Sequence, residues 1–201
     1  MLKTTTMIAL AATATTGLAG IELATNGGFE TGDTSGWESF PTANSTFNVT
    51  SDANSGSFAA EVFNNDAAAG AVVKQANLGI GQVNIGDTVT VSFALKGEGA
   101  AGGVAFAEFF TEIDGGGVST SQFLGDAPFA LTSDWTTYTY DILISGDVSG
   151  GVTLQFAAVT GGAPGSTSVL FIDDVSISVV PAPAGAALLG MGGLVAMRRR
   201  R

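Results

Sequence analysis

Apolar and polar residues alternate with a period of two along much of the chain between residues 45 and 178. In "DTVTVSFALKG", Val89, Val91, Phe93 and Leu95 fall on one face and hydroxyl residues on the other. Successive side chains of a β-strand point to opposite faces, so this pattern predicts a strand with one buried face. Three later segments repeat the pattern, with the sets Tyr138, Tyr140, Ile142 and Ile144; Val152, Leu154, Phe156 and Ala158; and Val169, Phe171, Asp173, Val175 and Ile177.

Four more segments have strand character, and glycine-rich breaks such as "GEGAAGG", "DGGG" and "SGDVSGG" separate the strands. These segments are Ser45–Thr50, Ser57–Asn64, Ala71–Leu78 and Val104–Ile113. About nine short strands without a long helix or an internal repeat predict an all-β fold, a single jelly-roll β-sandwich.

Composition excludes several kinds of chemistry. The 201 residues include 29 glycines but neither cysteine nor histidine. Disulfides, the common catalytic triads and the usual ligands of zinc, copper or non-haem iron are therefore absent. All 18 acidic residues lie between Glu22 and Asp174, where only Lys74 and Lys96 are basic. Such a surface repels phosphate backbones, so we expect no nucleic-acid partner.

The N-terminal segment, residues 1–19, predicts a signal peptide. "MLKTTTMIALAATATTGLAG" has one lysine, then apolar and small residues that end in Gly17-Leu18-Ala19. Small residues three and one positions before a cut suit signal peptidase, which predicts cleavage after Ala19. The alternative is an uncleaved anchor helix.

The C-terminal segment, residues 179–201, has three parts. The stretch 180–184 is "VPAPA", whose prolines favour an extended chain. Residues 184–197 form an uncharged run, expected to be a short transmembrane helix of about 21 Å, less than the roughly 30 Å hydrocarbon core of a bilayer. The positive block at the end favours the cytoplasmic side, and it consists of Arg198, Arg199, Arg200 and Arg201.

This three-part order resembles the PEP-CTERM sorting signal of exported bacterial proteins. The resemblance implies a transient stop in the inner membrane, cleavage by an exosortase, and delivery to the cell surface or extracellular matrix. The motif here comprises Val180, Pro181, Ala182 and Pro183, with Ala182 where the family has glutamate. The alternative is a retained tail anchor with a stop-transfer arginine cluster.

The middle of the chain, residues 20–178, carries a second resemblance. "ATNGGFETGDTSGW", "SGSFAAEV", "GDTVTVSFALKG", "DWTTYTYDI" and "FIDDVSI" follow in that order. They resemble carbohydrate-binding modules with the galactose-binding-like jelly roll. The family's structural calcium then implies a site with carboxylates from Glu30 and from Asp173 or Asp174, and carbonyl oxygens from the loop at Asn26. An inward-pointing Asp173 that merely accepts backbone N–H bonds is the alternative.

The remaining aromatic side chains are expected to have packing roles, whereas one group of acidic residues is the basis for an enzyme as an alternative. Trp37 and Trp135 are better suited to core packing or loop anchoring than to stacking on sugars, and the two tyrosines of 138–140 share an apolar face. "EFFTEID" places Glu108, Phe110, Glu112 and Asp114 on one strand face, which is the basis for a glycan-active enzyme as an alternative.

The sequence therefore predicts a non-catalytic, exported surface or matrix protein that binds exopolysaccharide and is held together by structural Ca²⁺. A glycan-active enzyme and a purely structural or adhesive protein are the alternatives.

Overall fold

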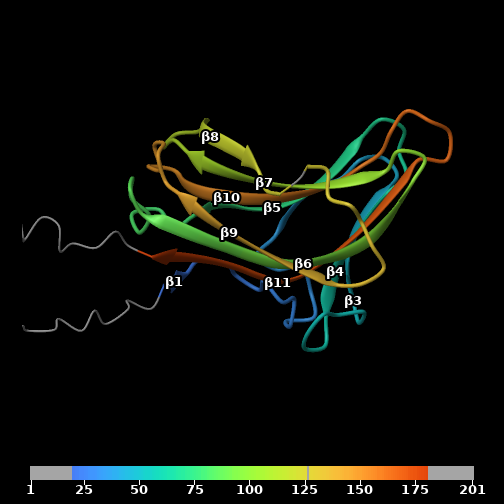
Figure 1. Cartoon of the computed structure of the whole chain (residues 1–201), viewed down its shortest axis with the longest axis horizontal. Coiled ribbons are helices and arrows are strands. Elements are labelled where there is room, and N and C mark those ends of the chain that lie inside the picture. Colours follow the sequence, from blue (N-terminus) through green and yellow to red (C-terminus); the bar gives the residue numbers. More distant parts are fainter. Residues whose placement is uncertain (1–19, 126, 181–201) are drawn as a thin grey trace, which may run out of the picture.

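The computed structural model describes residues 20–125 and 127–180. Eleven β-strands form two sheets that pack face to face as a sandwich, and the described residues contain no helix (Figure 1). The all-β sandwich is therefore confirmed. Within these two ranges, no helix has the length and apolar character to cross a membrane.

The first sheet, sheet A, has the order β3-β4-β11-β6-β9, and β1 pairs with the last part of β11. All of its neighbouring strands are antiparallel. Its strands are β1 (Ile21–Glu22), β3 (Ser45–Thr50), β4 (Ala59–Asn64), β6 (Thr88–Ala100), β9 (Thr136–Leu143) and β11 (Thr167–Val180).

The second sheet, sheet B, has the order β2-β5-β10-β7-β8 and is also antiparallel. Its strands are β2 (Glu38–Phe40), β5 (Gly70–Leu78), β7 (Val104–Glu112), β8 (Val118–Phe123) and β10 (Gly151–Val159). Sheet B is the upper layer in Figure 1, so its outer face looks upward in that view.

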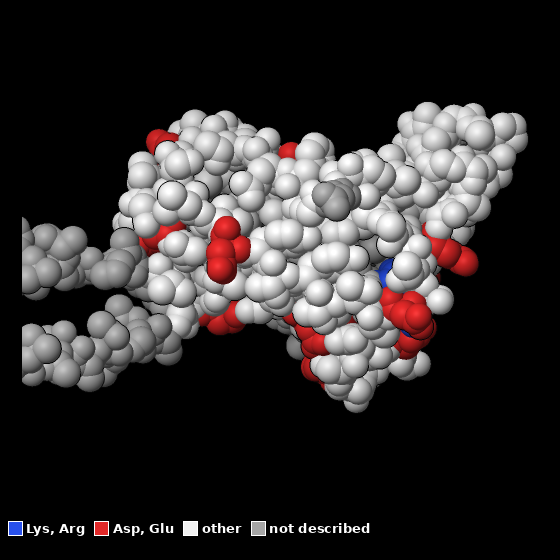
Figure 2. Space-filling view, in the orientation of Figure 1, with Lys and Arg blue, Asp and Glu red and all other residues white. Residues whose placement is uncertain are grey.

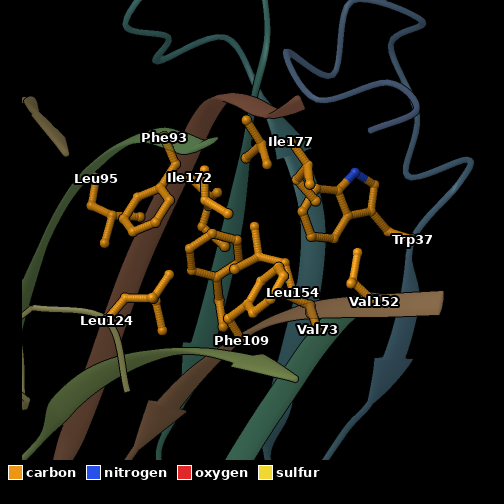
Figure 3. Packing of buried hydrophobic residues seen from close by; sticks show 14 of the residues in the cluster. Trp37, Val73, Phe93, Leu95, Phe109, Leu124, Val152, Leu154, Ile172 and Ile177 are labelled. Carbon is orange, nitrogen blue, oxygen red and sulfur yellow. The ribbon is translucent and has the colours of Figure 1, made fainter. Parts of the chain in front are cut away.

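One hydrophobic core fills the space between the sheets (Figure 3). Phe93 lies near its centre and contacts Phe156 edge to face, with ring centroids 5.0 Å apart. Burial of these apolar side chains is the main source of stability. Three of the expected apolar faces are correct: the β6 and β10 sets are buried, and the β9 set borders the core with its tyrosines half-buried.

The strands missed by the alternation pattern are short or lie at sheet edges. β1 and β2 have two and three residues, and β8 reads "VSTSQF", with almost every side chain exposed. Such strands carry little apolar periodicity because neither face enters the core. Eleven strands therefore replace the expected nine.

The apolar face expected for the last strand is wrong in its first half. Leu170 and Ile172 are buried, whereas Val169 and Phe171 lie on the outer face. A register shift after Asp173 switches the inward set to Val175, Ile177 and Val179. A β-bulge adds a residue to one strand and thereby reverses which side chains face inward.

Both described ends of the chain lie at the same end of the sandwich (Figure 1). Ile21 pairs with Val179, and Val180 pairs with Thr88 at the start of β6. Val180, the first residue of the expected sorting motif, is thus the last residue of β11. The expected signal peptide and the rest of the C-terminal segment lie outside the described residues.

Candidate functional site

A row of side chains able to form hydrogen bonds crosses the outer face of sheet B from one edge strand toward the other. The register opposes Glu38 to Lys74, Lys74 to Gln155, and Gln155 to Glu108. Lys74, Gln155 and Glu108 each lie between two buried residues of their strands, so alternation directs these three side chains outward, and Glu38 is exposed on the edge strand. Phe123 on β8 stands opposite Glu108 and ends the row.

Contacts along the row hold its members in place. Lys74 Nζ lies 3.9 Å from Glu38 Oε2 and 4.9 Å from the centre of the Phe40 ring. Gln155 Nε2 donates a hydrogen bond of 3.2 Å to Glu108 Oε2. This leaves the side-chain amide oxygen of Gln155 and Glu108 Oε1 without a partner among the described residues. Donors and acceptors thus remain for a ligand lying on the sheet.

Aromatic rings border this row. Phe106 and Phe123 pack at a centroid distance of 5.5 Å, and Phe40 and Phe123 are each at least half exposed. A hollow of about 210 Å³ lies beside the pair, lined by Phe106, Glu108, Phe123, Gln155, Ala157 and Val159. In Figure 1 the molecule also rises at both ends above the middle of this sheet. Apolar rings beside converging polar groups are typical of sites for small polar molecules.

Glu108, Phe110 and Glu112 share the outer face of β7, as the alternation predicts. Asp114 instead lies in the turn that follows the strand. Glu108 and Glu112 are four residues apart, or about 13 Å along a strand at the backbone. Glycosidase carboxyl groups lie about 5–10 Å apart. The backbone spacing of this pair therefore does not match that arrangement.

The residues of the predicted calcium site lie around the bulge in β11. Asp173 is fully buried, and its Oδ2 accepts N–H bonds from Asn54 (2.8 Å) and Ser55 (3.1 Å). Its Oδ1 accepts the N–H of Asp174 at 2.7 Å. Burial raises the pKa of the Asp173 carboxyl because it penalises the charged form, and the backbone donors oppose this shift only in part.

Glu30 reaches the same region from the loop before β2. Its Oε1 accepts N–H bonds from Ser57 (2.9 Å) and Phe58 (3.0 Å). Gly28 lies between the two carboxylates: a Cβ there would be 3.7 Å from Glu30 Cγ and 3.8 Å from Asp173 Oδ1. The fold thus brings Glu30 and Asp173 close to the same glycine.

The other two predicted ligands have different partners. Asp174 binds the side chains of Asn54 and Ser55 at 2.7 and 2.6 Å. The Asn26 amide donates to the backbone carbonyls of Asp33 and Ser35. Within residues 20–125 and 127–180, no three acidic side chains gather closely enough to hold a metal ion by themselves. Any ion here would therefore also need backbone carbonyl oxygens.

The two tryptophans have structural surroundings. Trp37 is a core residue that stacks on Phe29 at 5.3 Å and donates its indole N–H to the carbonyl of Asn26 (Figure 3). Trp135 precedes β9 on the outer side of sheet A, where the Lys96 ammonium lies 5.1 Å from the centre of its ring. Its indole N–H is buried without a partner in the described part of the chain.

Sheet A has a broader hollow of about 740 Å³ on its outer face. Lys96 lines this hollow, and its Nζ lies 5.0 Å from the centre of the Phe171 ring and 2.5 Å from an oxygen of Asp52. This one cation is already neutralised and covered by rings. Glu61, Glu98, Thr132 and Ser133 also line this hollow.

Sequence reasoning identified Glu108 but missed most of the row. Lys74 and Gln155 are the polar members of strands that were recognised, so alternation alone places them on the solvent face. Which strands are neighbours was the missing information, because β2, β5, β10 and β7 pair in an order that differs from their order in the sequence.

The model of the carbohydrate-binding domain family CBM_4_9 matches residues 22–165. No curated protein matches the chain. Among solved structures, the CBM22-1 xylan-binding domain of Paenibacillus barcinonensis Xyn10C has 17% identity and a TM-score of 0.58, with 82% of this chain and 97% of that chain covered.

Two other similar structures have different roles. The enzymatically active domain of bacteriophage CBA120 tailspike protein 4 has 14% identity and a TM-score of 0.63 over 80% of this chain, which spans 22% of that chain. A Stig cyclase, Fisc from Fischerella sp. TAU, has 15% identity and a TM-score of 0.56, with 82% of this chain and 100% of that chain covered. These likenesses establish the fold alone.

Proposed function

Because the chain belongs to the carbohydrate-binding domain family CBM_4_9, we propose that it binds a polysaccharide on the outer face of sheet B, without catalysis. The observation that carries this proposal is the row Glu38–Lys74–Gln155–Glu108, which ends at Phe123. Sugars present hydroxyl groups at their edges and apolar C–H surfaces on their faces. A row of donors and acceptors bordered by exposed rings suits both.

The shape of the face favours a chain over a single sugar. The row extends across five neighbouring strands, which at about 4.8 Å per strand spacing is close to 20 Å. The hollow beside Phe106 and Phe123 would seat one unit of the chain. We infer an exopolysaccharide as the ligand because the two ends of the sequence predict export.

A carbohydrate array probed with the folded domain tests this function. We expect retention on one class of polysaccharide, and a loss of affinity of about tenfold or more in Phe123→Ala, because an aromatic side chain in contact with the ligand supplies a large share of the binding energy. Val118→Ala is the matched control, an exposed apolar residue on the same strand but away from the row. Silence on the whole array would favour the structural or adhesive alternative. Hydrolysis that Glu108→Gln abolishes would favour the enzyme.

We further propose that the protein is exported after signal peptidase cleavage, held briefly in the inner membrane, and delivered to the cell surface or matrix by an exosortase. The sequence of residues 180–201 carries this proposal. The position of Gly20 and Val180 at one end of the sandwich supports it, because both cuts would then occur beside the same end of the folded domain.

We also propose a structural Ca²⁺ held by Glu30 and Asp173 with backbone carbonyl oxygens. The donor set contains only oxygen, as Ca²⁺ prefers, and a cation would add to the three backbone N–H groups that already compensate the buried Asp173 carboxylate. The ion would fasten the loop before β2 to the bulge in β11. Calcium should raise the melting temperature over that in chelator, and Glu30→Gln should remove the difference. An unchanged melting temperature in the wild type would refute the site.

A further inference from the structure

Exposed aliphatic residues gather at the end of the sandwich from which both termini leave. Seven of the nine large hydrophobic residues that are strongly exposed in the described chain lie there, and the other two are Phe40 and Phe123 on sheet B. We call these seven the terminal patch: Ile21, Ile80, Ile85, Ile113, Val118, Leu143 and Val180.

The topology places these residues together. Thr88 pairs with both Leu143 and Val180, and Ile21 lies beside Val179. Ile80 and Ile85 belong to the β5–β6 connection, whose Gly86 donates its N–H to the carbonyl of Ile144. Ile113 and Val118 flank the β7–β8 turn. In Figure 2 this end, where the grey termini leave, shows uncharged residues in white with a few acidic residues in red among them and no basic residue.

Such a patch is unusual for a surface that meets only water. Ile85 and Leu143 are each 66% exposed and Ile80 is 58% exposed, although the rest of the domain has ample polar residues at its turns. Exposed apolar side chains gathered at one end of a domain are typical of contact with a protein or a membrane.

We propose that the terminal patch rests on the lipid bilayer into which residues 184–197 insert. We choose lipid as the partner because the connection between the domain and the inserted run is short. From Val180, still paired in β11, to Ala184 the chain can span at most about 14 Å. The headgroup layer alone is about 5–8 Å thick. The inference rests on the proposal that the C-terminal run enters the inner membrane.

The charges at this end define the kind of lipid. Asp114 and Asp147 are exposed in its loops, Glu22 and Asp141 are exposed beside Ile21 and Leu143, and Lys74 and Lys96, the only basic residues in the described ranges, lie out on the sheets. The charged groups around the patch are acidic, so zwitterionic lipid suits this contact better than anionic lipid.

The experiment uses the chain with its C-terminal segment intact, made in a host without exosortase. The protein lacks cysteine, so a single fluorophore can be placed by Ile85→Cys, by Leu143→Cys, or by Ala163→Cys at the opposite end as the control. Each labelled protein is mixed with phosphatidylcholine vesicles that contain a nitroxide-bearing lipid. We expect loss of fluorescence at positions 85 and 143 and none at 163.

A triple variant, Ile80→Ser, Ile85→Ser and Leu143→Ser, gives a second measure. All three side chains are exposed, so the fold should tolerate the change, and partition into the vesicles should fall about tenfold or more.

Vesicle-bound protein whose labels at 85 and 143 stay as bright as the label at 163 would overturn the inference. Failure of the whole chain to bind vesicles would overturn the membrane premise as well. Glycan binding measured on the same variant stays unchanged and so separates this inference from the proposed sugar site.

Discussion

At the scale of single residues, Asp173 shows how one side chain joins loop and sheet. Its carboxylate accepts three backbone N–H groups, two of them from a loop almost 120 positions away in sequence. The sequence indicated an inward-pointing Asp173, because it alternates with apolar neighbours. It could not reveal the donors, since loop conformation follows from packing and not from periodicity.

The protonation of Asp173 predicts a pH dependence of stability in chelator. Burial raises its pKa above the ordinary 3.8, so the folded state binds more protons than the unfolded state. This carboxyl therefore contributes less to the free energy of unfolding as pH rises from about 3.8 through the folded-state pKa.

The difference in unfolding free energy between wild type and Asp173→Asn isolates that effect. The free energy of unfolding of the wild type, measured by urea unfolding, should fall relative to that of the variant as pH rises over this window. The lowered pKa values of Asp33, Asp66 and Asp147 act in the opposite direction but are common to both proteins. A difference that is flat with pH, or grows in favour of the wild type, would show that burial does not govern Asp173.

At the scale of elements, the bulge in β11 decides which residues meet the core. The alternation rule gave the correct faces for β6, β9 and β10 because these strands keep one phase toward the core. β11 changes phase at Asp173, and Asp174 there has a positive φ of 51°. Nothing in the period-two pattern of "SVLFIDDVSISV" marks where an extra residue enters.

The loop before β2 fits against this bulge at Gly27. The Val175 N–H donates to the carbonyl of Gly27 at 3.0 Å, and a Cβ at Gly27 would come within 1.9 Å of the Val175 carbonyl oxygen. Since that neighbour is backbone, it cannot rotate away. Gly27→Ala should therefore lower the free energy of unfolding by about 1–3 kcal/mol.

Chemical denaturation of Gly27→Ala beside Gly162→Ala provides the measurement. A Cβ at Gly162 would meet nothing within 4 Å, so this variant should be close to neutral. Equal stability of the two variants would mean that the loop does not press against β11 as described.

At the scale of the whole molecule, the sequence predicted the sandwich and the carbohydrate-binding resemblance but not the candidate face. The fold class follows from the alternation of apolar and polar residues within each strand, and this alternation is visible in the sequence of one chain. The row on sheet B depends on the strand order β2-β5-β10-β7-β8, which joins residues as distant as Glu38 and Phe123. Long-range pairing of this kind leaves no local pattern in the sequence.

The fate of the C-terminal segment is a prediction about the whole protein in its cell. We expect the intact mass of protein recovered from the cell surface or medium to end between Pro181 and Ala184, because exosortase would cut at the proline motif. Recovery of a mass that still includes Arg201 would instead indicate a retained tail anchor.

A glycan bound to the outer face of sheet B would change the NMR signals of the residues that it contacts, and a titration of the domain follows them one by one. With the oligosaccharide selected on the array, we predict the largest shifts at the Gln155 side-chain amide and around Phe106 and Phe123. The hollow near Lys96 on sheet A should stay unchanged. Shifts concentrated around Lys96 and Phe171, or spread over the terminal patch, would contradict the account.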